Sequence, residues 1–338
     1  VERRLLALCA EREPGERLPT VRELQARFGV SLATLDRALR RVVARGLVER
    51  RHGSGLYVAD EAGRRRLAMV FAPRFFQTMS GSPFWPLLIA AAERATAARG
   101  WGFELHLARP ERDDAPLPDE EFAPSLSREV AAGRVDGVLS VGVIHAHSRW
   151  LESRGLPVSA YAGAAAWSVG LDSAAFARRM IGALVAKGHR RIAVLGREPG
   201  DARVYTDEVV RSGLTPVPVP PATGDPGERG AFWAAAIDDR DVDAVAITDD
   251  VLAHHYLVGV RKRPAAPFVA SFAVVGSPTL APWAGEIVTV AVDPAEIVER
   301  MLEPIERRFD GAPLGPGWRP LPEEPALLRH DVGPRESN

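Results

Sequence analysis

The sequence predicts an α/β protein built from doubly wound parallel sheets, preceded by a small, mainly helical module of about sixty residues. Beyond residue 66, short apolar runs alternate with longer amphipathic segments. Near-continuous apolar runs are typical of parallel strands that helices cover on both faces. More than eight strand–helix steps fit into about 270 residues, which indicates two sheets rather than one.

The composition places the chain among globular proteins of more than one domain. Its 338 residues exceed an average domain, and its 46% hydrophobic and 26% charged residues are ordinary values. No apolar run approaches the roughly 20 residues of a membrane span, and the first residues do not form a signal-peptide pattern. Cys9 is the single cysteine, so an intramolecular disulfide is excluded. We therefore expect a cytoplasmic protein without membrane partners.

The charge is distributed unevenly along the chain. Residues 1–66 contain fifteen arginines and nine acidic residues, which gives this segment a charge of +6. Because the whole chain carries −1, the remainder carries −7. A basic module on an acidic body indicates a polyanionic partner for the front end only.

Two short helices are predicted in this basic segment. Thr20 with Glu23 forms a T-x-x-E capping box that begins the first of them, and Gly29 ends it. Ser31 caps the second helix, which ends at Gly46. Strand-like residues 47–51 and 56–59 follow, joined by a hairpin turn. Two helices around a tight glycine turn are typical of the helix-turn-helix, although periodicity alone also allows a small helical interaction domain.

Three motifs in this segment are more specific than the periodicity. R-L-P-T-x-R-E-L, G-V-S-x-x-T-x-x-R-A-L and G-L-V-x-R-R-x-G-S-G-x-Y-V follow one another with the spacing of a known family. Over residues 1–59 the chain resembles the winged helix-turn-helix of GntR-type regulators. The resemblance implies that double-stranded operator DNA is the partner. The residues it assigns to DNA binding are Arg22, Ser31, Leu32, Ala33, Thr34, Arg37, His52 and Gly53.

The second helix departs from the family at three positions. Many members have Arg, Thr and Arg where this chain has Leu32, Ala33 and Asp36. The helix is therefore less basic than usual, and Leu32 or Ala33 is expected to contact a thymine methyl group instead.

Beyond the linker, strands and helices alternate. Strands are predicted at 67–72, 103–108, 135–141, 157–161, 192–195, 215–219, 244–248 and 269–275, and helices at 83–99, 120–132, 173–187, 203–212, 228–238 and 250–261. A TIM barrel or a two-domain dehydrogenase has the same alternation, but no G-x-G-x-x-G follows the first strand. We therefore predict no dinucleotide cofactor, and no other cofactor.

The residue types that carry catalysis or bind metals do not form a convincing group. His145 with His147, and His254 with His255, lack cysteine or carboxylate partners at metal-like spacing. Asp249-Asp250 has no acid/base partner that the sequence can name. We expect no metal site, no catalytic residue and no enzymatic activity.

Six segments follow one another along the body: Ser82-Pro83-Phe84-Trp85, the AAGRVDGVL at 131–139, Val169-Gly170-Leu171-Asp172, the KGHRRIA at 187–193, Thr248-Asp249-Asp250-Val251-Leu252-Ala253, and residues 290–308. In this order they resemble the LacI/GalR-type effector domain, which is related to periplasmic sugar-binding proteins. The resemblance implies a two-lobed, periplasmic-binding-protein-like domain. The expected organisation is a winged helix-turn-helix at 1–60, a linker at 61–66 and an effector domain at 67–338. Its first lobe would comprise 67–162 and 290–312, and its second 163–289 and 313–333.

The same resemblance assigns ligand-binding residues. Trp85 would stack on the ligand with Phe84 beside it, although core packing is the alternative for both. Asp250 would accept hydrogen bonds from ligand hydroxyls, and Arg203 (or Arg197) would be the ligand-binding arginine. Ala162-Gly163 stands where many members have an acidic contact, and Gly276-Ser277-Pro278 replaces the family's G-F-D-D.

We therefore predict a homodimeric repressor, dimerising through helix 84–99 and the surface around 294–309, whose operator affinity a sugar-like effector controls. Two alternatives stay open. One is a constitutive dimeric DNA-binding regulator whose effector domain has lost ligand binding. The other is a small-molecule binding protein or enzyme whose basic front end is only an interaction module.

Overall fold

The structure is a computed structural model that describes residues 1–59, 64–73, 83–110, 117–196, 199–237, 241–261, 263, 265–310 and 328–332. The chain divides into two compact units. The first is formed by Val1–Ala72, Thr96–Ala166 and Pro304–Ala326, and the second by Pro73–Ala95, Trp167–Glu303 and Leu327–Asn338. Linker residues 61–63, Ser82 and Arg197 lie outside the described residues. The bounds of the two lobes expected from the sequence stay a prediction.

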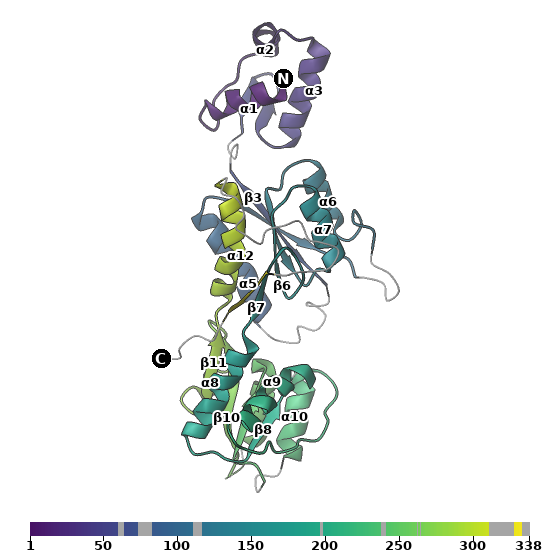
Figure 1. The fold of residues 1–338 in the computed structure, drawn as a ribbon. Helices are drawn as coiled ribbons and strands as arrows, with labels where there is room; N and C mark the ends of the chain where they lie inside the picture. Colours follow the sequence, from purple (N-terminus) through teal and green to yellow (C-terminus); the bar gives the residue numbers. More distant parts are fainter. Residues whose placement is uncertain are drawn as a thin grey trace. The chain divides into compact units, whose positions relative to one another are not determined.

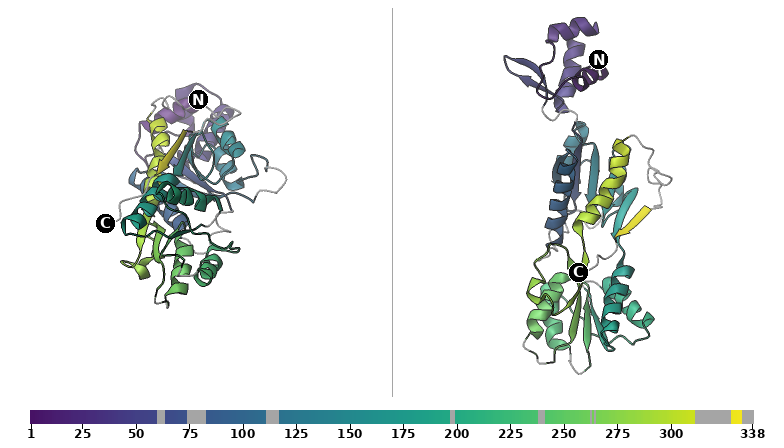
Figure 2. Two further views of the ribbon diagram at one scale, coloured as in Figure 1. Left: turned by 60° about the horizontal axis from the view of Figure 1, so that its bottom comes forward. Right: turned by 90° about the vertical axis from the view of Figure 1, so that its left-hand side faces the viewer.

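The N-terminal module has three helices and a hairpin, and it includes the two predicted short helices. The helices are α1 (Glu2–Ala10), α2 (Val21–Phe28) and α3 (Leu32–Ala44). Strands β1 (Val48–Arg51) and β2 (Gly55–Val58) are antiparallel and project from the helices (Figure 2, right). Apolar side chains from all five elements form one buried cluster; its fully buried members include Leu5, Leu24, Leu35, Leu39 and Val42.

Local sequence signals determine where these helices begin and end. The Thr20 side chain accepts a hydrogen bond from the Glu23 backbone N–H, and the Glu23 carboxylate accepts one from the Thr20 N–H. This reciprocal pair is the predicted capping box. Gly29 closes α2 in the left-handed conformation, with φ of 64°, where a side chain would be strained. The predicted caps of α2 are therefore confirmed.

The first unit also contains a parallel sheet (Figure 1). Strand β3 (Arg66–Phe71) lies between β4 (Gly102–Leu107) and β5 (Gly137–Val141), and β6 (Val158–Tyr161) pairs with the other edge of β5. Helices α6 (Pro124–Ala131) and α7 (His145–Ser153) contribute Leu126 and Leu151 to its buried core.

The end of a late helix completes this unit. Helix α12 (Pro294–Phe309) brings Ile305 onto β5, where a Cβ at Gly137 would lie 2.8 Å from the Ile305 Cγ2. Glycine at position 137 therefore allows this close approach. Arg99 forms an ion pair with Glu306 of the same helix, with 3.2 Å between Nε and Oε1.

The second unit has a four-stranded parallel sheet of order β11-β10-β9-β8. The strands are β8 (Ile192–Leu195), β9 (Ala244–Ile247), β10 (Phe268–Val274) and β11 (Val288–Val292). Helices lie on both sides of it (Figure 2, right): α8 (Ser173–Ala186) packs with α9 (Pro199–Arg211), and α10 (Pro226–Ala236) with α11 (Asp250–Val260). The unit also contains strand β7 (Trp167–Leu171), paired with β12 (Leu328–Val332), most of helix α5 (Phe84–Ala98), and a 3-10 turn at Ala281–Trp283.

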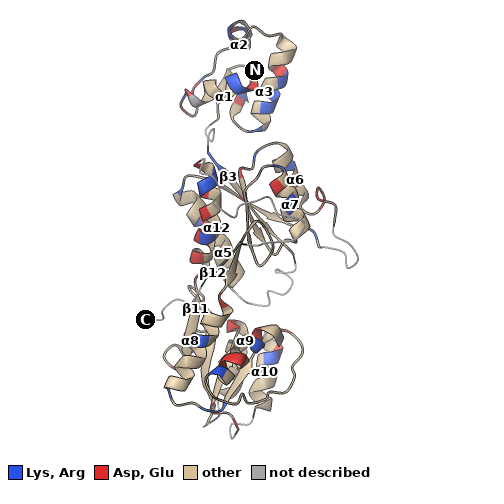
Figure 3. Cartoon of the chain, in the orientation of Figure 1, with Lys and Arg blue, Asp and Glu red and all other residues tan. Residues whose placement is uncertain are grey.

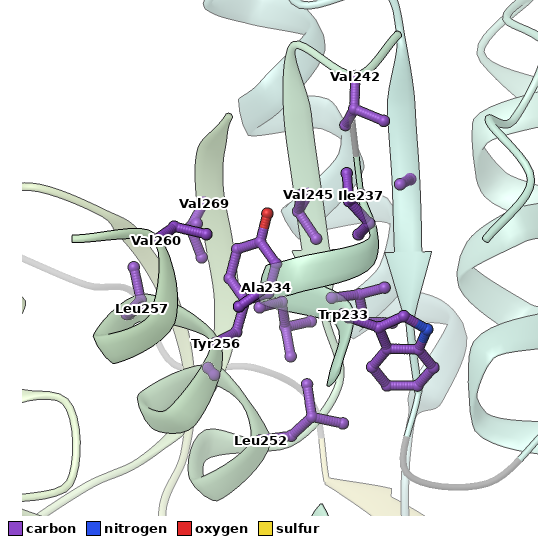
Figure 4. Packing of buried hydrophobic residues seen from close by; sticks show 14 of the residues in the cluster. Trp233, Ala234, Ile237, Val242, Val245, Leu252, Tyr256, Leu257, Val260 and Val269 are labelled. Carbon is purple, nitrogen blue, oxygen red and sulfur yellow. The ribbon is translucent and has the colours of Figure 1, made fainter. Parts of the chain in front are cut away.

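The core of this unit surrounds Tyr256, which is fully buried. Trp233 of α10 and Leu252 of α11 pack in the same cluster with Val245 and Val269 from the sheet (Figure 4). The Trp233 indole N–H donates to the Pro220 carbonyl at 2.8 Å, so the one polar atom of this side chain is satisfied.

The predicted fold class is confirmed: parallel sheets with flanking helices follow a winged helix module. One predicted strand, at 215–219, is wrong. Val217 forms only an isolated bridge with Ala193. Pro216 and Pro218 supply no backbone N–H, so a continuous ladder cannot form there. Within the described residues no helix is long and apolar enough to cross a membrane.

Candidate DNA-binding surface and effector-lobe residues

The start of α3 presents a row of exposed side chains. Ser31 caps the helix: its Oγ accepts the Thr34 backbone N–H at 3.3 Å and lies 2.9 Å from the Thr34 Oγ1. Leu32 is 56% exposed, which is unusual for a large apolar side chain in a helix. Ala33 and Arg37 are exposed as well. The first turn of a recognition helix is the part that meets base edges in the major groove.

The other predicted DNA-binding residues lie at the start of α2 and at the tip of the wing. Arg22 is the second residue of α2 and is exposed. His52 and Gly53 form the exposed turn between β1 and β2, and Gly53 has a left-handed φ of 71°. The eight predicted residues thus fall on three exposed places of one module. Their contacts with DNA stay a prediction.

The hairpin that carries this tip is braced by polar contacts. The guanidinium of Arg51 lies 4.5 Å from the centre of the Tyr57 ring, and the Tyr57 hydroxyl is 2.6 Å from the Ser54 Oγ. Arg51 also pairs with Glu49 at 3.0 Å. These contacts hold the turn on the strands that support it.

An acidic residue interrupts the basic surface of α3 (Figure 3). Asp36 pairs with Arg40 one turn later, at 3.2 Å between Nη2 and Oδ2, and with Arg50 of β1, at 3.5 Å between Nη2 and Oδ1. Sequence reasoning missed both arginines as members of this surface. The signal for Arg40 was the i,i+4 spacing from Asp36, whereas nothing local indicates Arg50.

The end of α3 contacts the sheet-containing part of the first unit. Arg134, which follows α6, donates from Nη1 to the Ala44 carbonyl at 2.7 Å. Its Nη2 lies 2.6 Å from the Glu129 Oε1, and the hydrogen bond from Arg134 lowers the pKa of Glu129 below its usual value. Arg134 therefore joins the last turn of the recognition helix to the turn before β5.

In the second unit, Asp250 is the predicted ligand contact with the most defined surroundings. It is the first residue of α11, and only 2% of it is exposed. Ser277 donates from Oγ to the Asp250 Oδ2 at 3.4 Å. Burial and then the neighbouring charge of Asp249 raise the pKa of Asp250 to about 6, against the opposing hydrogen bond from Ser277.

Ser277, which donates to Asp250, belongs to the loop after β10, and this loop also contacts His254 of α11. Ser277 and Thr279 are joined by a 2.9 Å hydrogen bond between their hydroxyls. His254 of α11 contacts the Thr279 carbonyl through Nδ1 at 3.0 Å, and its ring meets the Trp283 ring edge-on at 4.8 Å. Sequence reasoning missed this set because its members lie up to 30 residues apart, although Gly276-Ser277-Pro278 had been singled out as a departure from the family.

The other predicted ligand-binding residues lie elsewhere in this unit. Phe84 and Trp85, at the start of α5, are both buried and meet edge-on with 4.9 Å between ring centres. Arg203 is on α9 with its side chain 83% exposed, and it pairs with Asp207 one turn later at 4.0 Å. The described contacts of Arg203 and Asp250 therefore do not join them. Their roles in ligand binding stay predictions.

The segment in which the sequence lacks the family's acidic residue, Ala162-Gly163, lies in the first unit. After β6, Ala162 has a φ of 50°, a conformation that a non-glycine residue adopts at a cost. At Gly163 a Cβ would lie 2.7 Å from the Val143 carbonyl oxygen and 3.0 Å from the Val143 nitrogen. Because these are backbone atoms, position 163 has no room for an acidic side chain.

The described residues contain no group of three or more histidine, cysteine or carboxylate side chains that could hold a metal ion. The exposed start of α3 and the exposed turn of the hairpin form the candidate nucleic-acid-binding surface of the module.

The module matches a known family. Residues 6–58 match the bacterial regulatory proteins of the gntR family. They are similar to the mannosyl-D-glycerate transport/metabolism system repressor MngR of Escherichia coli (strain K12), with 47% identity over 51 residues. That alignment covers 15% of this chain and 21% of the repressor. The chain spans about a fifth of the length of the curated relatives it matches.

Solved structures share the fold of the body. The transcriptional regulator CelR in complex with cellobiose has a TM-score of 0.56 and 19% identity, covering 94% of this chain and 98% of that one. GanP, a glucose-galactose binding protein from Geobacillus stearothermophilus, has a TM-score of 0.56 and 16% identity, covering 80% and 96%. Both resemblances expected from the sequence, GntR-type at the front and LacI-like in the fold of the body, are therefore confirmed.

Proposed function

We propose that this protein is a DNA-binding transcriptional regulator whose operator affinity is controlled by a small ligand. The observation that carries the proposal is the exposed start of α3, with Leu32, Ala33 and Arg37, in a module that has a wing and matches the gntR family over residues 6–58. Such a helix can enter the major groove with its wing on the adjacent backbone. Two relatives that support this proposal are named as repressors.

The effector is a sugar or a related metabolite. The support is the fold shared with regulators and binding proteins of named sugars, one of them a cellobiose complex. Asp250 supplies a carboxylate and Trp85 an aromatic face, which are the groups a sugar site uses. In this proposal the protein is a homodimer, because a twofold dimer presents two recognition helices one helical turn of DNA apart. The proposal also makes it a repressor that acts in the cytoplasm.

The hydrogen bond from Arg134 to the Ala44 carbonyl gives this control a physical route. It ties the last turn of the recognition helix to the α6–β5 turn of the body. A ligand changes DNA affinity only to the extent that it binds one arrangement of the body more tightly than another.

A second candidate function is a constitutive DNA-binding regulator whose body binds no ligand. Two observations favour it. Ala162-Gly163 stands where many members of the family have an acidic contact, and position 163 has no room for a side chain. Asp250 is already engaged by Ser277 of its own unit.

The test is selection of binding sequences from a random duplex library by the purified full chain, followed by titration of the selected duplex with and without ligands. Mono- and disaccharides, sugar phosphates and nucleosides make up the ligand panel. We expect a selected sequence and at least one ligand that changes its affinity about tenfold or more, corresponding to about 1.4 kcal/mol of coupling. Selection without any ligand response supports the second candidate. If no sequence is enriched and binding to random duplex is absent, DNA regulation is wrong.

A further inference from the structure

Asp36 is bound by two arginines, one on each carboxylate oxygen. Oδ2 faces the Nη2 of Arg40 at 3.2 Å, and Oδ1 faces the Nη2 of Arg50 at 3.5 Å. The two guanidinium groups come from different elements, the recognition helix and the first strand of the wing. One carboxylate therefore connects the two parts of the module that approach DNA.

The secondary structure places these three side chains together. Leu32, Asp36 and Arg40 are spaced by four residues, so they lie on successive turns of one helix face. Along β1, Val48 is buried against the module core. Arg50 shares the face of Val48 because side chains alternate along a strand. This alternation directs Arg50 toward α3, while Glu49 and Arg51 pair with each other on the opposite face.

The pairs are exposed, and exposure limits what they contribute to folding. The side chains of Asp36, Arg50 and Arg40 are 37%, 53% and 72% exposed. Ion pairs at such positions add little to the free energy of unfolding, because water and salt screen them. Their consequence is electrostatic at the DNA-facing surface: with Asp36 the three residues carry a net charge of +1, and without it +2.

We propose that Asp36 is a specificity-determining residue that restrains Arg40 and Arg50 from indiscriminate phosphate binding. The proposal rests on the proposed function in DNA binding. Contacts with phosphates supply essentially all of the affinity for random sequence. Restraining two arginines therefore weakens random binding. At a specific site the base contacts set the register, so a smaller share of the affinity depends on these two arginines. The ratio of specific to random affinity rises as a result.

The experiment compares full-length wild type with Asp36→Asn on two duplexes, one selected by the wild type and one of random sequence, over a series of salt concentrations. Asparagine keeps the shape of the side chain and removes one negative charge. About one more phosphate is then neutralised, so the slope of log K against log salt on random duplex steepens by about 0.9. We expect about tenfold tighter random binding near 0.1 M salt, a change under threefold on the selected duplex, and a specificity ratio that falls correspondingly.

Glu11→Gln is the matched control. Glu11 is exposed at the C-cap of α1, in the same module, and its substitution removes the same charge at another place. It should leave the slope and the ratio unchanged. In the Asp36→Asn background, Arg50→Gln should reduce the steepened slope by about one phosphate. The same substitution in the wild type should change the slope by less than half as much.

Two outcomes overturn the proposal. One is an Asp36→Asn protein that is folded by circular dichroism and keeps the wild-type slope and ratio. The other is a changed preference at a single base pair with an unchanged slope, which means that Asp36 itself reads a base, such as the amino group of cytosine. Failure of the proposed function is distinct, because the wild type itself would then select no sequence.

Discussion

The N-terminal module and the α/β body differ in how far apart in the sequence their interacting residues lie. Within residues 1–59, helix caps and turns depend on residues three or four positions apart, such as Thr20 and Glu23. In the body, important contacts such as that of Asp250 with Ser277 join residues from different elements. The contrast teaches that local sequence specifies the elements of the reading module, whereas the polar contacts of the body depend on its tertiary fold.

The largest test of this contrast is removal of the module. A chain lacking residues 1–60 should lose sequence-selective DNA binding, a fall in affinity of at least about 10³-fold measured by fluorescence anisotropy on the selected duplex. The body should keep its far-ultraviolet circular dichroism and its own unfolding transition. Retained selective binding would contradict the assignment of DNA reading to the module, and loss of the body's transition would show that the body needs the module in order to fold.

Adding a single methyl group at Gly163 should destabilise the body. Gly163→Ala places a Cβ 2.7 Å from the Val143 carbonyl oxygen. We expect the free energy of unfolding, measured by urea titration, to fall by about 1–3 kcal/mol because two backbone segments must separate. Gly182→Ala is the matched control: Gly182 lies in α8 with no atom within 4 Å of the added group. That variant should gain about 0.5–1 kcal/mol from its lower backbone entropy. Equal effects of the two substitutions would contradict the close crossing at position 163.

The last prediction concerns the pH dependence of stability. Because the folded state holds the pKa of Asp250 at about 6, above the ordinary value near 3.9, the native state binds more protons between these values. The contribution of Asp250 to the free energy of unfolding is therefore complete below about pH 4 and is lost as the pH rises through about 6. The loss is at most about 3 kcal/mol.

Asp250→Asn should abolish this decline in urea titrations across pH 4–7. Asp249→Asn should move the decline to lower pH, because the charge of Asp249 contributes to the raised pKa. Asparagine still caps α11 in place of Asp249, so a general loss of stability is not expected. Parallel pH profiles of the three proteins would contradict the buried, charge-coupled environment of Asp250.

Where the apolar periodicity was clear, the sequence predicted helices and strands both in the module and in the body. Helix α7 was missed because its buried face is largely polar: His147, Ser148 and Glu152 are buried there beside Leu151. Such a face carries no 3.6-residue apolar pattern. The residues 215–219 have alternating valines that mimic a strand, but the intervening prolines cannot join a ladder.

The candidate-site residues also fall into two groups, those with partners nearby in the sequence and those with partners in other elements. Ser31 was found as a helix cap from the sequence because the hydrogen bond to Thr34 is local. The bond between Asp36 and Arg50, and that between Ser277 and Asp250, join different elements, and no propensity or spacing encodes them. Residues whose partners come from the tertiary fold are therefore the ones that only the structure identifies.

The packing of Ile305 on Gly137 also has a consequence for the order in which the chain is completed during synthesis. The module is complete by residue 59, but β5 gains its covering helix only once residue 305 has been made. At 5–20 residues per second this interval is roughly 10 to 50 s. A nascent or prematurely terminated chain from this interval carries a finished DNA reader with an unfinished body.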